Sequence, residues 1–190
     1  MKRISLILAL LAIALLVFSS AVLSQEKAKT EQKAFKYMGI QKCKLCHSSA
    51  PKGKVYDWWT NNKHSKAYTT LANDESKKIA NQMGIADAQK SEKCLTCHVT
   101  GYKTPADQKG IKYVAEEGVT CEACHGPSEA YVTTHTKDPK SAIKEQGLVM
   151  PTKEVCLACH NKNSPTYEEL KFPDAFKQIK HGPSAATPVK

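Results

Sequence analysis

Arginine is almost missing from this 190-residue chain: Arg3 is the only one among 28 basic residues, which stand against 18 acidic ones. Proteins that bind nucleic acids usually set arginines against base edges and phosphates, within a basic patch. Beyond residue 24 the chain has 26 lysines, 18 acids and a net charge of +8, with no such patch. We therefore predict that the protein does not bind nucleic acid.

Long hydrophobic runs are also lacking, except for one at the very start. Two basic residues precede an apolar stretch from Ile4 to Phe18, and small residues follow as far as Ser24. This three-part pattern predicts a cleaved secretory signal peptide over residues 1–24, with an uncleaved anchor as the alternative. A stretch of fifteen residues, broken by Ser5, is short for a membrane span, so we expect a periplasmic or extracytoplasmic protein with no span after cleavage.

No cysteine falls outside one repeated pattern, Cys-x-x-Cys-His. The four copies are Cys43, Cys46 and His47; Cys94, Cys97 and His98; Cys121, Cys124 and His125; and Cys156, Cys159 and His160. Two thiols three positions apart lie on one face of a helical turn, so both reach the vinyl groups at one porphyrin edge, and the histidine reaches the iron. The pattern is the attachment signal of c-type haem. It predicts four covalently bound haem c groups.

Other uses of paired cysteines fit the sequence less well. Four pairs could form two Cys₄ zinc sites, but zinc would not require a histidine after each pair. Disulfides within Cys-x-x-Cys close very small loops and stabilise little. Thioredoxin-like redox pairs occur in a βαβ pattern, and the sequence shows no such strands.

The chain contains seven histidines, which limits the ligands available to four irons. His47, His98, His125 and His160 are the predicted proximal ligands, which leaves His64, His135 and His181 for four distal positions. One haem is therefore left without a distal histidine. Its sixth position is empty, water-bound, or held by a methionine, of which Met38, Met83 and Met150 are available.

Length and composition predict one haem-binding domain. We expect a flexible lead-in over residues 25–36, a tetrahaem cytochrome c domain over 37–183 and a disordered tail over 184–190. With about forty residues for each haem, the chain is too short to enclose each porphyrin separately, so the haems should pack on one another. The expected fold is mainly α, with short helices, long loops and little β.

Local patterns place the helices between the haem motifs. A helix is predicted over 74–83, with an asparagine or aspartate cap at its start and Gly84 at its end. The residues of 99–119 predict a turn-rich loop with room for one short hairpin. A Thr166/Glu169 capping box predicts a helix over 167–171. The remaining predicted helices cover 56–71, 139–146 and 172–180.

Three segments resemble the tetrahaem cytochrome c-554 family. They are the pattern Trp-x₄-His-x-Lys-Ala from Trp59 to Ala67, the segment CHVTGY over 97–102, and GVTCEACHGP over 118–127 with His135 ten positions beyond His125. The resemblance covers most of the chain, from Tyr37 to about His181. It implies a mainly helical fold with closely stacked haems.

The resemblance also implies a ligand set. Carried over residue by residue, His135 ligates the first haem opposite His47, and His64 ligates the fourth opposite His160. His181 ligates the third opposite His125. The second haem, at His98, is then the one with an open position.

These features favour an electron carrier over an enzyme. The leading hypothesis is an exported cytochrome that relays single electrons between a redox enzyme and a terminal acceptor in a respiratory chain, with both redox partner proteins unidentified. Lysines around haem edges would attract an acidic partner. The alternative is reduction of nitric oxide or a similar small ligand at the open haem of His98. A polymerised haem wire is a third hypothesis, but full bis-histidine ligation needs eight histidines.

Overall fold

The computed structural model describes residues 34–181, all but the first of which belong to the unit that begins at Phe35. The predicted signal peptide, most of the lead-in and the predicted tail lie outside the described residues. Short helices and loops make up the described chain, which has no β-strand and a single isolated bridge between Tyr37 and Lys109. The prediction of a mainly α fold with little β is confirmed. In the same range, no helix is both long and apolar enough to cross a membrane.

The helices are mostly one to two turns long. The α-helices are α2 (Ile40–His47), α3 (Val55–Thr60), α4 (Ala67–Thr70), α5 (Asp74–Gln82), α6 (Glu92–His98), α7 (Cys121–His125), α8 (Pro139–Glu145), α9 (Lys153–Leu157) and α10 (Phe172–Ile179). The 3₁₀ turns are η1 (Ala50–Lys52), η2 (Lys63–Lys66), η3 (Ala88–Lys90), η4 (Ala106–Gln108) and η5 (Ala115–Glu117). Helices this short draw little stability from their own hydrogen bonds and depend on what they pack against.

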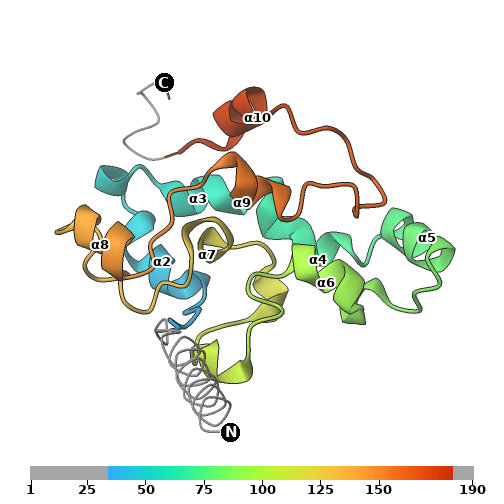
Figure 1. The fold of residues 1–190 in the computed structure, drawn as a ribbon, viewed down its shortest axis with the longest axis horizontal. Helices are drawn as coiled ribbons and strands as arrows, with labels where there is room; N and C mark the ends of the chain where they lie inside the picture. Colours follow the sequence, from blue (N-terminus) through green and yellow to red (C-terminus); the bar gives the residue numbers. More distant parts are fainter. Residues whose placement is uncertain (1–33, 182–190) are drawn as a thin grey trace, which may run out of the picture. The chain divides into compact units, whose positions relative to one another are not determined.

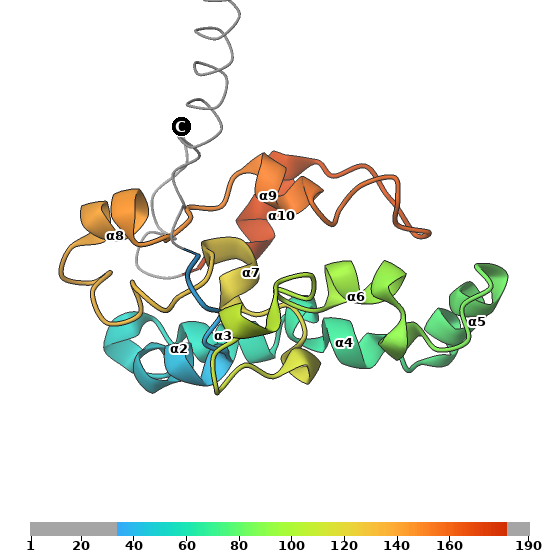
Figure 2. The same ribbon diagram turned by 60° about the horizontal axis from the view of Figure 1, so that its bottom comes forward.

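Helices that are close in the sequence and helices that are distant in it both lie side by side. Figures 1 and 2 show α2 next to α3, and α4 next to α6. Helix α2 also contacts α7, although more than seventy residues separate them in the sequence. The first and third Cys-x-x-Cys-His motifs, which lie on α2 and α7, are therefore neighbours.

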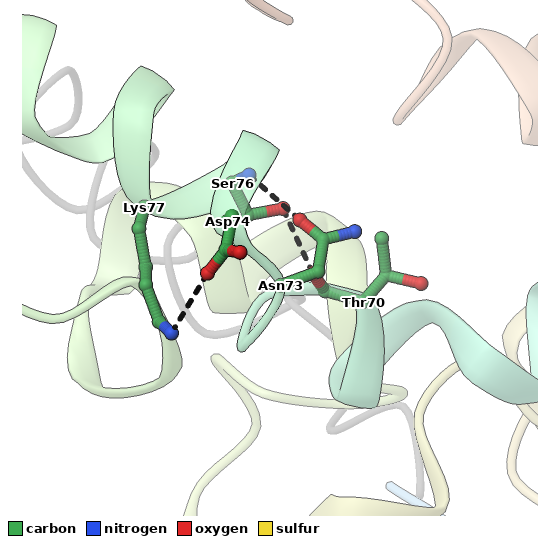
Figure 3. A network of polar contacts seen from close by, with 5 residues as sticks. All are labelled: Thr70, Asn73, Asp74, Ser76 and Lys77. Carbon is green, nitrogen blue, oxygen red and sulfur yellow. Dashed lines mark hydrogen bonds and ion pairs between the residues drawn. The ribbon is translucent and has the colours of Figure 1, made fainter.

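Polar capping fixes the start of α5 as the sequence predicts. The Asn73 side chain accepts a hydrogen bond from the Ser76 N–H at 2.7 Å, and the Ser76 hydroxyl donates to the Thr70 carbonyl at 2.8 Å (Figure 3). Lys77 pairs with Asp74 at 3.3 Å on the exposed side of the helix. The cap satisfies an N–H group that the first helical turn leaves without a partner.

The helix predicted over residues 56–71 is divided into three pieces. Helix α3 ends at Thr60, η2 follows, and α4 begins at Ala67. Asn62 causes the break, because its side chain accepts a hydrogen bond from the N–H of His64 at 3.2 Å. Such local side-chain bonds compete with the helical ladder. Because of this break, His64 lies in η2, between α3 and α4.

Two other predictions from local pattern were wrong. Residues 167–171 form no helix, because so short a helix depends on packing and none of their side chains is buried, and Pro173 prevents a helix from continuing through to α10. The loop over 99–119 contains no hairpin and instead holds η4 and η5. The helices predicted over 139–146 and 172–180 are present as α8 and α10.

The apolar core of the described residues is small and lies around the second Cys-x-x-Cys-His motif. It consists of Leu71, Ala80, Ala88, Leu95 and Val99, with Tyr68, Ile85, Tyr102 and Tyr113 packed against it. Leu95 belongs to α6, between the two cysteines of that motif. The second motif therefore packs, through Leu95, against the main cluster of buried apolar side chains.

Candidate haem-attachment sites

Each Cys-x-x-Cys-His motif forms a helical turn. The first three motifs end helices α2, α6 and α7, and each of these helices ends at the motif's histidine. The fourth begins in α9, and the N–H of His160 continues the turn by donating to the carbonyl of Cys156 at 2.9 Å. All eight cysteines are free thiols. This is the local geometry that covalent haem attachment requires, with both thiols on one face of a turn.

Thiols from different motifs approach one another. A hydrogen bond with the Cys121 thiol, together with burial, raises the pKa of the Cys43 thiol. Burial and the Cys97 thiol raise the pKa of Cys159 to about 12. Burial, with the Cys156 thiol next in importance, raises the pKa of Cys124 to about 11. The first motif therefore adjoins the third, the third adjoins the fourth, and the fourth adjoins the second.

Six of the seven histidine rings lie opposite one another in three pairs. The ring centres are 5.9 Å apart for His47 and His135, with planes inclined by 20°. They are 6.1 Å apart for His64 and His160, inclined by 86°. For His125 and His181 the separation is 6.0 Å and the inclination 84°. Each pair joins one motif histidine to one histidine from elsewhere in the chain.

These separations fit one metal ion between each pair of rings. With metal–nitrogen bonds of about 2.0 Å and ring nitrogens about 1.2 Å from the ring centre, an ion between two imidazoles sets the centres roughly 6.4 Å apart. Two imidazoles in van der Waals contact could stack more closely than this. The pairs are the same three that the family resemblance implies. Ligation of iron by them stays a prediction.

Hydrogen bonds to backbone carbonyls orient four of the rings. The Nδ1 atoms of His98, His125, His135 and His181 lie 2.7, 3.0, 2.8 and 2.8 Å from the carbonyls of Ala67, Val149, Tyr131 and Ile179 respectively. An Nδ1–H that donates to a carbonyl leaves Nε2 with its lone pair available for a metal. This second interaction also fixes the ring's direction. All four rings are therefore held in the tautomer that suits a ligand.

Aromatic side chains support two of the histidines that lie outside the motifs. The Trp58 ring centre is 4.4 Å from that of His181, and the Tyr131 ring centre is 5.9 Å from that of His135. Tyr131 is buried, and its hydroxyl donates to the carbonyl of Gly126, just after the third motif. The position of His135 is thereby tied to the third motif while its ring faces the first.

Burial favours the neutral form of two of the paired rings. Desolvation, followed by the nearby His160, lowers the pKa of His64. Desolvation also lowers the pKa of His125, with smaller effects from His181 and His135. A neutral imidazole is the form that binds a metal, so burial favours the form of these side chains that a ligand needs.

His98 differs from the other motif histidines. Within residues 34–181 no second histidine ring lies opposite it, and its Nδ1 is directed to the carbonyl of Ala67. Among the methionines, Met38 packs against Gly110, while Met83 and Met150 are exposed at 38 % and 58 %. The histidine count had left one iron without a distal imidazole, and the geometry associates that shortage with His98.

Buried polar contacts join the second motif to the segment before the third. The backbone N–H and the hydroxyl of Thr100 both donate to the carbonyl of Gly118, at 2.9 and 3.0 Å. The N–H of Thr120 donates in turn to the Thr100 hydroxyl at 2.8 Å. From the other side, the indole N–H of Trp59 donates to the carbonyl of Val119 at 2.9 Å. These bonds explain why CHVTGY and GVTCEACHGP act as one structural unit.

Sequence reasoning missed one residue of the site, Glu122. This carboxylate lies between Cys121 and Cys124, is only 1 % exposed, and accepts backbone N–H bonds from Met38, Gly39 and Ser128, all at 2.8 Å. Three N–H donors satisfy a buried carboxylate, whose burial would otherwise be costly. An acidic residue inside a haem motif was the available signal, but its partners are more than eighty positions away for two of the three bonds.

The helical fold, the four motif turns and the opposed histidines define a small c-type cytochrome. A family described as cytochrome c554 and c-prime matches residues 42–126, which contain the first three motifs. A cytochrome c-554 of Nitrosomonas europaea is 28% identical over 158 aligned residues, which cover 72% of this chain. This chain spans 63% of the length of that relative. The search of solved structures found no match.

The chain is similar to the cytochrome c-554 family over the segment that holds its first three motifs, as those motifs had indicated. This similarity supports covalently bound haem c. The fit of the described residues supports this, because they supply paired thiols on helical turns and imidazoles at ligand spacing.

Proposed function

We propose that the chain is an exported tetrahaem c-type cytochrome that relays single electrons between a redox enzyme and a terminal acceptor in a respiratory chain. The observation that carries this proposal is the set of three histidine pairs at 5.9 to 6.1 Å. Zinc or disulfide chemistry at the Cys-x-x-Cys turns would not require three imidazole pairs at this spacing.

The chain's own residues would hold the cofactors in distinct roles. The cysteine pairs supply thioether links, and His47, His98, His125 and His160 supply the proximal ligands. His135, His64 and His181 complete the first, fourth and third sites. Bound haem supplies the one-electron chemistry, and bis-histidine ligation favours lower potentials than methionine–histidine ligation. Low potentials suit an electron carrier at the reducing end of a respiratory chain.

The contacts between motifs support a relay. The interactions of Cys43 with Cys121, of Cys124 with Cys156 and of Cys159 with Cys97 support a continuous series of the four attachment turns. In such a series the first and second motifs would stand at the two ends. Such a series lets an electron enter at one end of the protein and leave at the other, which a single-site enzyme does not need.

The test is to count and titrate the cofactors of the protein exported by its own host. Its intact mass should exceed that of the processed chain by four haem units, and acid–acetone should extract no haem. All four haems should be reduced and reoxidised reversibly in a potentiometric titration. Recovery of zinc, or of only one or two haems, would overturn the proposal, as would haems that cannot be cycled.

A second candidate function is reduction of a small ligand such as nitric oxide at the haem of His98. The favouring observation is that His98 alone among the motif histidines has no histidine ring opposite it in the described chain. Turnover of nitric oxide with a chemical reductant, compared with the rate of electron delivery to a protein acceptor, separates the two functions. Ligand binding without appreciable turnover would leave the protein a carrier.

A further inference from the structure

The outer side of α2 carries a shallow hollow of about 470 Å³. Its lining residues are Gln41, Lys42, Lys44, Leu45, Ser48 and Lys112. Four of the six come from α2 itself, Ser48 caps its C-terminal end, and Lys112 comes from the turn that packs against the start of the helix. We call this set the α2 outer surface.

Haem at the first motif would not fill this hollow. Cys43, Cys46 and His47 stand at i, i+3 and i+4 and so share one side of α2. Leu45 and Gln41 lie on the opposite side, because successive side chains turn by about 100°. Lys42 and Lys44 lie on the two flanks between these sides. The centre of the α2 outer surface, at Leu45, therefore faces away from the thiols that would attach the first haem.

The surface combines positive charge with exposed apolar side chains. Three of its six lining residues are lysines, and none is acidic. Leu45 is 80 % exposed, and Ile111, the neighbour of Lys112, is 95 % exposed. The Lys44 ammonium stands 5.0 Å from the ring centre of Tyr56, which restricts its motion. An apolar centre with a charged rim is the composition of a protein-docking site.

The place of the surface suits electron exchange. Leu45 lies between Cys46 and Cys43 in the sequence, so the surface covers the back of the turn that attaches the first haem. The helix backbone in between is a cylinder of about 2.3 Å radius. The first motif is also one end of the series of attachment turns, where an electron would enter or leave.

We propose that the α2 outer surface is the docking site for an acidic redox partner protein, which places carboxylates against Lys42, Lys44 and Lys112 and an apolar side chain against Leu45. This inference rests on the proposed electron-carrier function and adds to it the site and the chemistry of the partner. In the exchange, the partner loses one electron and one ferric haem iron becomes ferrous. Charges at the rim of such a contact act mainly on the association rate.

The probe for the test is a plant-type [2Fe–2S] ferredoxin, an acidic protein that donates one electron. The holoprotein is reduced by it in a stopped-flow instrument, and the binding of the oxidised ferredoxin is measured by calorimetry. The variant is Lys42→Glu with Lys112→Glu, both outside the Cys-x-x-Cys-His motif. The control is Lys78→Glu with Lys140→Glu, which changes the net charge equally at exposed lysines of α5 and α8.

We expect the α2 variant to lower both the second-order rate and the affinity by about tenfold at low salt, and the control by less than about twofold. Leu45→Ser should weaken binding by about fivefold while leaving the salt dependence of the rate unchanged. Haem content and the rate of reduction by dithionite should be the same in every variant, which shows that the haems still accept electrons.

Equal losses in the α2 variant and the control would overturn the docking site and leave the carrier function standing. A wild-type holoprotein that dithionite cannot reduce reversibly would instead refute the carrier function. Binding to phosphatidylglycerol vesicles that the α2 variant loses, with an unchanged ferredoxin rate, would assign the surface to a membrane and also overturn the proposal.

Discussion

The buried carboxylate of Glu122 accepts a hydrogen bond from the backbone N–H of Gly39 at 2.8 Å. Gly39 is the residue before α2, and Glu122 lies inside the third Cys-x-x-Cys-His motif, in α7. The bond therefore ties the start of the first haem turn to the third. Together with the Met38 bond to the same carboxylate, it sets how closely α2 and α7 approach.

Replacing Glu122 with glutamine should loosen this junction. The Oε2 atom that accepts from Gly39 becomes an amide nitrogen that cannot accept, while Oε1 keeps its bonds from Met38 and Ser128. We expect a loss of about 2 to 3 kcal/mol in the free energy of unfolding, measured by guanidinium titration of the holoprotein. The midpoint potentials of the adjoining haems should also rise, since a buried negative charge is removed.

Glu129→Gln provides the control for this experiment. Glu129 also accepts a backbone bond, from Lys36 at 3.1 Å, but it is exposed. The expected change in stability is below about 0.5 kcal/mol. Equal effects of the two variants would show that burial between the motifs gives Glu122 no special role.

Gly39 itself should resist substitution more strongly than another glycine of positive φ. Its backbone has φ 83° and ψ 156°, and a Cβ would stand 2.2 Å from the carbonyl oxygen of Lys112. At Gly84, with φ 67°, a Cβ would meet nothing within 4 Å. We expect Gly84→Ala to cost about 1 kcal/mol and Gly39→Ala at least about 3 kcal/mol, measured by thermal or chemical unfolding. Similar costs would mean that the contact with Lys112 relaxes easily.

What the sequence predicted correctly was local. A Cys-x-x-Cys-His turn needs only five consecutive residues, and the cap at Asn73 needs four, so spacing alone located both. The opposition of His47 and His135 joins positions far apart, and only the family resemblance suggested it before the fold was known. No sequence pattern pointed to Glu122 as the junction of two motifs.

The errors have the same origin. The Thr166/Glu169 pattern is a valid helix start, but a helix this short depends on packing, and none of residues 167–171 is buried. In residues 56–71 the apolar spacing was helical, yet the Asn62 side chain formed a competing bond with the N–H of His64. Single polar side chains decided these boundaries, and their partners depend on the folded chain.

The angle between the two imidazole planes of each pair predicts the type of paramagnetic resonance signal that each haem should give. The planes of His47 and His135 are inclined by 20°, whereas those of His64 and His160 are inclined by 86°. Near-parallel imidazoles separate the iron d-orbitals and give a rhombic low-spin signal, and near-perpendicular ones give a strongly anisotropic signal. In paramagnetic resonance spectra, His135→Ala should abolish the rhombic signal and His64→Ala an anisotropic one, with a new high-spin signal in each.

The folded state of these variants can be checked by circular dichroism, and Lys78→Ala on α5 serves as an unrelated surface variant. An unchanged spectrum in His135→Ala would show that His135 is not an iron ligand. Loss of an anisotropic signal in His135→Ala, in place of the rhombic one, would show that the loaded protein pairs its histidines differently.

The haem at His98 should be the only one that binds an external ligand. His98 has no histidine ring opposite it within residues 34–181, and the other six histidines already form three pairs. The reduced holoprotein should therefore bind carbon monoxide at one haem in four, with a high-spin signal in the oxidised protein beforehand. If Met38, Met83 or Met150 supplied the sixth ligand, all four haems would be low-spin and one potential would exceed the other three. Replacing each of these methionines with leucine separates the cases. If wild-type protein binds carbon monoxide and none of the replacements changes that binding, the open position is assigned to the haem of His98 alone. Absence of binding in fully loaded protein would remove the small-ligand reductase from consideration.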